Sequence, residues 1–172
     1  MRIQRGTRAI VTGSSRGIGK ALSVELAGRG ARLGLMARGK EGLDEVSAKL
    51  PESPDGAHVT AAADVSKWGQ TSKAIDRLAK RLGGIDLLVV NAGVLHYGPF
   101  AEQELAEAES MVQVNVLGTM YTVKAALPHM LSGSGGHIVV LSSAAGLRSF
   151  SVGRRLRRDE GLRPRLRRGA SP

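Results

Sequence analysis

RAIVTGSSRGIG (residues 8–19) joins a short apolar run to a glycine-rich turn. Residues 8–12 are typical of a buried β-strand, because all but Arg8 are apolar or β-branched and the run is followed by glycine. From Gly17 onward, apolar residues recur at four-residue spacing, which predicts an amphipathic helix. The residues that recur in this way are Ile18, Leu22 and Leu26. The sequence therefore predicts a strand, a turn and a helix in direct succession.

The glycines of this turn, Gly13, Gly17 and Gly19, point to a phosphate-binding loop. Glycine allows a tight turn and a close approach of the backbone to a ligand. The N-terminus of the following helix supplies amide donors and a partial positive charge. The simpler interpretation is a strand–helix turn without a ligand. Its position after the first strand of a βαβ unit favours the dinucleotide interpretation.

Strand and helix patterns alternate through the rest of the body. Further strands are expected over residues 31–36, 58–63, 86–90 and 137–141. Further helices are expected over residues 39–50, 66–82 and 102–131. Alternating elements favour parallel βαβ units with right-handed crossovers. The predicted fold class is α/β, a doubly wound parallel sheet of about five strands with four helices.

Composition excludes several classes of protein. The 172 residues contain no Cys, which excludes a disulfide scaffold, a thiolate metal site and a Cys nucleophile, and no metal site is predicted. Aromatic residues make up 3% of the chain, so the core is expected to be aliphatic. No apolar run is long enough to span a membrane, and no apolar leader is seen, so we expect a cytoplasmic protein that does not bind membranes.

The net charge of +10 is unevenly distributed. Residues 1–153 hold 17 Lys and Arg against 13 Asp and Glu, whereas residues 154–172 hold 8 Arg against only Asp159 and Glu160. We therefore expect one folded domain over residues 1–153 and an Arg-rich, disordered tail over residues 154–172.

Five motifs resemble those of the short-chain dehydrogenase/reductase family. Residues 12–19 match its Thr-Gly-x-x-x-Gly-x-Gly loop, and the other matches are Asp64-Val65, Asn91-Ala92-Gly93, Asn115 and Ser142-Ser143. The resemblance covers residues 7 to about 150 and implies an NAD(P)-binding Rossmann fold. Each residue taken alone has a simpler interpretation as a turn or cap residue, but the shared order and spacing favour function.

The resemblance implies specific site residues. The catalytic residues would be Ser143, which would hold the substrate oxygen, and Asn115, which would support a proton-relay water. The cofactor-binding residues would be Gly13, Ser15, Arg16, Gly17, Ile18, Gly19, Arg38, Asp64, Val65, Asn91, Ala92 and Gly93. Asp64-Val65 would contact the adenine, and Asn91-Ala92-Gly93 would steady the central sheet.

The end of the second strand favours NADP over NAD as cofactor. A carboxylate there would accept hydrogen bonds from the ribose hydroxyls of NAD, but residues 36–40 contain no acid. Arg16 and Arg38 could instead hold a 2′-phosphate. The simpler interpretation is two solvated surface arginines. On the substrate side, the loops over residues 95–100 and 146–148 would line a pocket for a small carbonyl or alcohol.

The family's Tyr/Lys pair is absent from the expected positions, which hold Leu156 and Glu160. Read one base later, with a permitted choice of codons, residues 153–161 give Ala-Ala-Val-Tyr-Gly-Ala-Thr-Lys, with Tyr at position 156 and Lys at position 160. We therefore infer a frameshift just before Arg154, against the alternative of a genuine basic tail. The lost C-terminal elements would leave apolar surface open on the fifth strand and on the long helix. The family is expected to form homo-oligomers, and this loss argues against one here.

Three functions follow. The first is an oxidoreductase that transfers hydride between NADP(H) and a carbonyl/alcohol pair. The second is a catalytically inactive NADP(H)-binding remnant. The third is a nucleic-acid binder that uses residues 154–168, which is disfavoured because the Arg cluster has no interleaved aromatic residues for base stacking.

Overall fold

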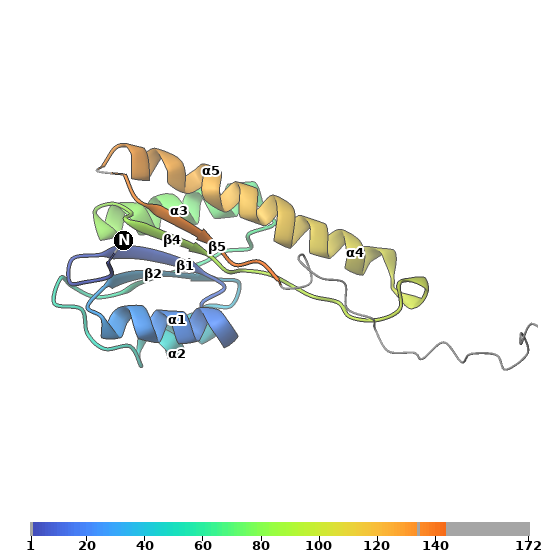
Figure 1. Ribbon diagram of the computed structural model, residues 1–172, viewed down its shortest axis with the longest axis horizontal. Coiled ribbons are helices and arrows are strands. Elements are labelled where there is room, and N and C mark those ends of the chain that lie inside the picture. The colour runs from blue at the N-terminus through green and yellow to red at the C-terminus, as the bar shows by residue number, and fades with distance from the viewer. Residues whose placement is uncertain (1, 134, 144–172) are drawn as a thin grey trace, which may run out of the picture. The chain divides into compact units, whose positions relative to one another are not determined.

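Five parallel strands form one sheet in the computed structural model, in the order β3-β2-β1-β4-β5 (Figure 1). The structure describes residues 2–133 and 135–143, and it separates into units of residues 1–142 and 143–172. The strands are β1 (Arg8–Thr12), β2 (Arg32–Ala37), β3 (Val59–Ala62), β4 (Leu87–Val90) and β5 (His137–Val140). The helices are α1 (Gly17–Gly28), α2 (Lys40–Ser47), α3 (Trp68–Leu82), α4 (Leu105–Met111) and α5 (Gly118–Leu131). The predicted fold class is confirmed, whereas the predicted domain boundary at residue 153 and the tail lie outside the described residues.

Helices cover both faces of the sheet in the first unit. Figure 1 shows α1 and α2 on one face and α3 and α5 on the other. Neighbouring residues of a strand point to opposite faces, so Ile10 and Leu88 pack under α3 and α5, while Val11 and Val89 pack under α1 and α2. Strands buried on both faces explain why the sequence shows continuous apolar runs instead of alternation.

The amphipathic helix α3 lies as predicted. Its residues Ile75, Leu78 and Leu82 are buried, and the helix is followed by Gly83, which has a left-handed φ of 82°. Ile18, in the first turn of α1, is 64% exposed.

The predicted single helix over residues 102–131 is interrupted. A 3-10 turn covers Phe100–Glu102, α4 begins at Leu105, and a π-helical segment, Val112–Leu117, joins α4 to α5. A π segment has one wider turn than an α-helix and frequently occurs at functional sites. The remaining boundaries agree with the predicted ones to within three residues, the largest difference being in α2, which ends at Ser47 and not at residue 50.

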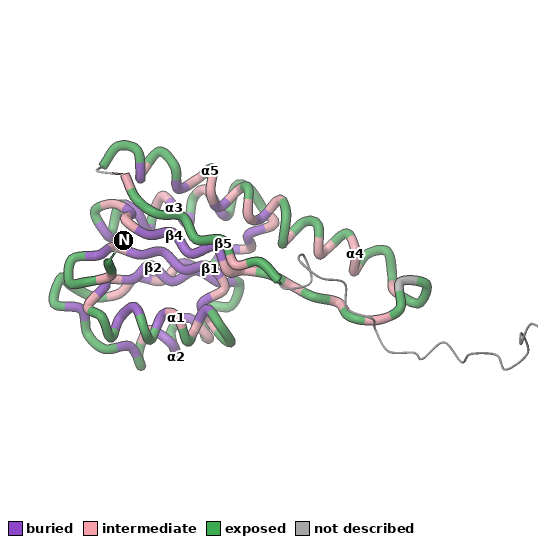
Figure 2. Tube along the Cα trace, in the orientation of Figure 1, coloured by how far each residue is buried: buried purple, intermediate pink, exposed green. Residues whose placement is uncertain are grey.

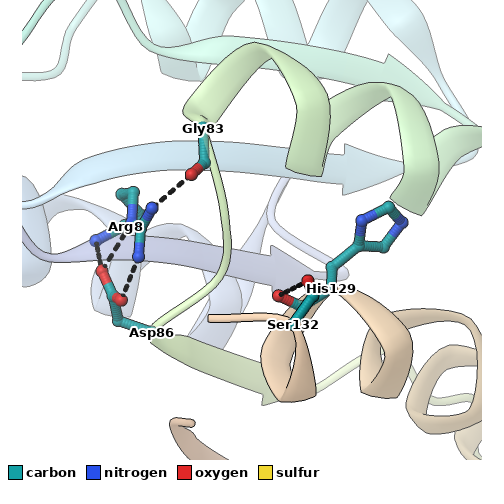
Figure 3. A network of polar contacts seen from close by, with 5 residues as sticks. All are labelled: Arg8, Gly83, Asp86, His129 and Ser132. Carbon is teal, nitrogen blue, oxygen red and sulfur yellow. Dashed lines mark hydrogen bonds and ion pairs between the residues drawn. The ribbon is translucent and has the colours of Figure 1, made fainter. Parts of the chain in front are cut away.

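An ion pair between Arg8 and Asp86 joins β1 to the start of β4, at the amino-terminal edge of the sheet (Figure 3). Arg8 Nη2 donates to Asp86 Oδ1 at 2.6 Å, and Arg8 Nε donates to Oδ2 at 2.9 Å. Arg8 also donates to the carbonyl oxygen of Gly83, at the end of α3. The hydrogen bond from Arg8 lowers the pKa of Asp86 more than partial burial raises it, so that pKa lies below its ordinary value.

The edge strand β5 is exposed along its whole length in the described structure (Figure 2). Ile138, Val139 and Val140 are 37%, 46% and 49% exposed. Large apolar side chains are also exposed along the α4–α5 segment, namely Leu105, Val112, Val116, Met120, Leu127 and Leu131. Open apolar surface is therefore present where the sequence predicted it. Among the described residues, no helix is both long and apolar enough to cross a membrane.

Candidate functional site

A cavity of about 480 Å³ lies at the carboxyl ends of β1 to β4. The chain order of the sheet reverses between β1 and β4, and ligands of open α/β sheets bind at such a switch point. Eleven of the twelve predicted cofactor-binding residues line the cavity: Gly13, Ser15, Arg16, Gly17, Ile18, Arg38, Asp64, Val65, Asn91, Ala92 and Gly93. Four segments that are far apart in the sequence therefore meet in one place.

Glycine is required at three positions of the loop that follows β1. Gly13 and Gly17 have φ values of 67° and 56°, which favour glycine. A Cβ on Gly13 would also lie 2.8 Å from Asn91 Nδ2. Gly19, the one predicted cofactor-binding residue outside the cavity wall, packs beneath the loop, where a Cβ would overlap the carbonyl oxygen of Gly13. These glycines bring the start of α1 directly under the cavity floor.

The first turn of α1 has the features of an anion-binding helix end. Its N-cap, Arg16, is extended and makes no side-chain capping bond, and no acidic side chain occupies the first turn. The first backbone N–H groups are therefore not capped by a side chain, and the partial positive charge of the helix end is not offset. Together with the cavity above it, this arrangement suits a phosphate group.

Thr12 and Asn91 join the carboxyl ends of β1 and β4. Thr12 Oγ1 accepts hydrogen bonds from the backbone N–H groups of Asn91 and Ala92, both at 3.0 Å. Asn91 Nδ2 donates to the carbonyl oxygens of Thr12 at 2.9 Å and Gly13 at 3.2 Å. The side chain of Asn91 therefore holds the glycine loop against β4, in keeping with the steadying role that the resemblance implied.

Two arginines line the cavity, and in the described part of the chain the side chain of neither forms a hydrogen bond or an ion pair. Arg16 lies at the start of α1 and Arg38 directly follows β2, and both are exposed. Among the described residues, their charges are therefore available to a bound anion. The bidentate geometry of a guanidinium suits a phosphate.

Asp64 lies beside Arg38 in the cavity wall. Partial burial raises the pKa of the Asp64 carboxyl, but hydrogen bonds from Ser66 and the charges of Arg38 and Lys67 lower it more. The net pKa is below the ordinary value, so Asp64 is ionised at neutral pH.

Asn115 lies outside the cavity wall, although its neighbour Val114 lines it. Within the π segment, the Asn115 side chain accepts from the backbone N–H of Val94 at 2.9 Å and donates to the carbonyl oxygen of Val94 at 2.8 Å. The backbone carbonyl of Asn115 accepts from the hydroxyl of Thr119 at 2.8 Å. The side chain therefore ties the π segment to the loop after β4, which is a positioning contact.

The other predicted site residues are placed as follows. Ser143, the last described residue, begins the second unit, and the cavity is formed by the first unit. In the loop after β4, Leu95 and Tyr97 are 77% and 74% exposed and do not line the cavity, and His96 pairs with Glu107 at 3.3 Å. The second predicted substrate loop, residues 146–148, and the positions of Leu156 and Glu160 lie outside the described residues.

Five lining residues were not predicted: Ala37, Gly39, Ala63, Val94 and Val114. Each is the chain neighbour of a predicted residue. The strand ends alone could have identified Ala37, Ala63 and Val94, because the carboxyl ends of parallel strands meet at one edge. The sequence does not identify Val114 in this way, because its position depends on the π segment.

Known proteins are similar to this chain in sequence. Residues 7–154 match the family model described as short chain dehydrogenase. The chain is 33% identical over 138 residues to an uncharacterized oxidoreductase of Staphylococcus saprophyticus, covering 80% of this chain and 59% of that protein. It is 34% identical over 144 residues to an uncharacterized oxidoreductase of Listeria monocytogenes, covering 84% and 58%. The chain thus spans less than two thirds of the length of these relatives.

Solved structures are similar to this chain as well. A short chain dehydrogenase from Burkholderia cenocepacia, crystallised with NADP, is similar with a TM-score of 0.79 and 33% identity, covering 88% of this chain and 61% of that one. Carveol dehydrogenase from Mycobacterium avium, crystallised with NAD, is similar with a TM-score of 0.79 and 31% identity, covering 87% and 59%. From the sheet order, the cavity and these matches together, the chain belongs to the short-chain dehydrogenase/reductase family.

Proposed function

We propose that this chain binds NADP(H) in the cavity at the carboxyl edge of its sheet, as the cofactor-binding part of an oxidoreductase that acts on a carbonyl/alcohol pair. The observation that carries the proposal is the convergence of eleven predicted residues on one cavity. The cofactor would supply the hydride, and the chain's own residues would bind and orient it.

The residues that line the cavity suggest where the parts of such a cofactor would lie. The N–H groups at the start of α1, over Gly17 and Ile18, would hold the pyrophosphate. Asp64 and Val65 would contact the adenine at the ends of the outer strands. Arg16 and Arg38 would hold the 2′-phosphate, because they line the same cavity and have no other anion paired with them in the described structure. NAD remains the alternative, since the structural relatives include one complex with each cofactor.

We do not expect this chain to catalyse carbonyl reduction. Leu156 and Glu160 stand where the family's Tyr and Lys would fall, and a general acid/base contributes about 10²–10⁴-fold in rate. We therefore expect NADPH binding without carbonyl reduction. Robust turnover that depends on Ser143 would contradict this expectation and favour an active enzyme. The cytoplasmic location and the absence of nucleic-acid binding stay predictions from composition.

Calorimetric titration of the full chain with NADPH and NADH tests the proposal. We expect saturable binding of both, with NADPH the tighter ligand. Gly19→Ala should weaken both by at least about tenfold, because its Cβ would overlap the loop backbone. Gly28→Ala is the matched control on the same helix, where a Cβ meets nothing within 4 Å.

The Arg38→Asp variant distinguishes the binding of NADPH from the binding of NADH. It should weaken NADPH far more than NADH, because only NADPH carries the 2′-phosphate. Equal losses for both would exclude the 2′-phosphate role of Arg38. Failure of the unaltered chain to bind either cofactor would refute the proposed function as a whole.

A further inference from the structure

Asp64 and Arg38 follow the ends of neighbouring strands, Arg38 one residue after β2 and Asp64 two residues after β3. The backbone N–H of Ala63 donates to the carbonyl oxygen of Ala37 at 2.9 Å, and Asp64 and Arg38 are the residues that directly follow this bonded pair. Both line the cavity. The fold therefore places a carboxylate next to the arginine assigned to the 2′-phosphate.

The carboxylate is fixed, whereas the arginine is not. Asp64 Oδ1 accepts from the backbone N–H of Ser66 at 2.9 Å and from its hydroxyl at 2.8 Å. The backbone N–H of Asp64 donates to Gln70 Oε1 at 3.0 Å. Among the described residues, Asp64 forms no ion pair within 4.0 Å. A negative charge is thus held in place near Arg38 without neutralising it by direct contact.

We propose that Asp64 is a selectivity residue that lowers the affinity of this chain for NADPH relative to NADH; this inference rests on the proposed function. A bound 2′-phosphate is attracted by Arg38 and repelled by the fixed carboxylate beside it. The ribose of NADH carries no phosphate at this position, so the carboxylate does not repel it. Arg38 therefore raises the affinity for NADPH relative to NADH, and Asp64 lowers it.

Asp64→Asn tests this directly, because the amide oxygen can still accept both hydrogen bonds from Ser66 while the charge is removed. We expect NADPH to bind about three- to tenfold more tightly and NADH to bind equally or more weakly. The NADPH gain should shrink with added salt, since the site is partly exposed. Asp64→Ser is the second variant, which removes the charge and keeps a short polar side chain in the turn.

Trp68 provides the readout. It is the only tryptophan of the chain and lies three residues after Val65, so its fluorescence should respond to cofactor binding. Asp44→Asn is the matched control, because it makes the same change in net charge at an exposed position outside the cavity wall. Adenosine 2′,5′-bisphosphate and 5′-AMP, titrated by calorimetry, isolate the phosphate from the nicotinamide.

The outcomes separate the two proposals. A gain for NADPH and the bisphosphate, without a gain for NADH and 5′-AMP, supports the selectivity role. Equal changes for all four ligands, a loss for NADPH, or the same gain in Asp44→Asn would overturn it. If the unaltered chain binds no cofactor, the proposed function fails. If it binds both and Asp64→Asn leaves their ratio unchanged, only the selectivity role fails.

Discussion

Arg8 and Asp86 show how one pair of side chains secures the sheet. Their side chains are 30% and 23% exposed, and they form two hydrogen bonds across the β1–β4 junction. Asp86→Asn should lower the free energy of unfolding at neutral pH by about 1–2 kcal/mol, because it removes a charged hydrogen-bonding partner. Chemical denaturation of both proteins measures this difference, with the exposed Asp44→Asn as the control expected to change little.

The same pair predicts a pH dependence. The folded-state pKa of Asp86 is lowered by Arg8, so its stabilising effect is fully present above the unfolded pKa of about 4. The effect is lost as the pH falls through the lower folded pKa. The unfolding free energies of the unaltered protein and Asp86→Asn should therefore converge in acid. A difference that stays constant down to pH 2 would contradict this account.

Single residues were the easiest part of the site to predict. The glycines of the loop followed from local chemistry, because the turn needs them, whereas Asp64 and Asn91 followed only from the family resemblance. The exposure of Ile18 was not predictable from periodicity, because four-residue spacing describes a helix face and not what lies beneath it. The hydrogen bonds between the Asn115 side chain and the backbone of Val94 could not be predicted either, because the two residues are 21 positions apart in the sequence.

The π segment leads into the helix α5 beside Val65, one of the residues that line the cavity. It ends at Gly118, where a Cβ would lie 2.9 Å from Val65 Cγ2, and Val65 lines the cavity. Gly118→Ala should therefore displace Val65, weaken NADPH binding by about three- to tenfold and lower the melting temperature. Gly69→Ala in α3 is the control, because a Cβ there meets nothing within 4 Å.

Cofactor titration and thermal melting of both variants check this prediction. Unchanged affinity in Gly118→Ala would show that the helix can move without affecting the cavity. At this scale the sequence predicted the order and type of the strands and main helices. It missed the break at Val112–Leu117, because a π turn preserves apolar spacing on both sides and depends on tertiary contacts.

The whole molecule presents apolar surface on β5 and on the α4–α5 segment. We infer that residues 154–172 were not selected to cover it, because eight Arg cannot be buried without partners. A chain ending at Gly153 should then melt within about 2 °C of the full chain. A chain carrying the restored reading frame, extended to the family's length, should melt higher and remain soluble.

DNA sequencing across codons 143–172 and thermal melting of the three chains check the frameshift interpretation. A coding sequence that cannot yield Tyr at position 156 in the shifted frame would exclude it. Unfolding on removal of residues 154–172 would show instead that this segment is structural.

The central claim is that the cavity at the carboxyl edge of the sheet is the cofactor site. Hydrogen exchange of the full chain with and without saturating NADPH tests it most directly. We predict slower exchange at the backbone amides of residues 16–19, 38–39, 64–65 and 91–94, because these segments line or support the cavity. Binding of NADPH that leaves these amides unchanged, or that protects the exposed β5 edge instead, would contradict the account.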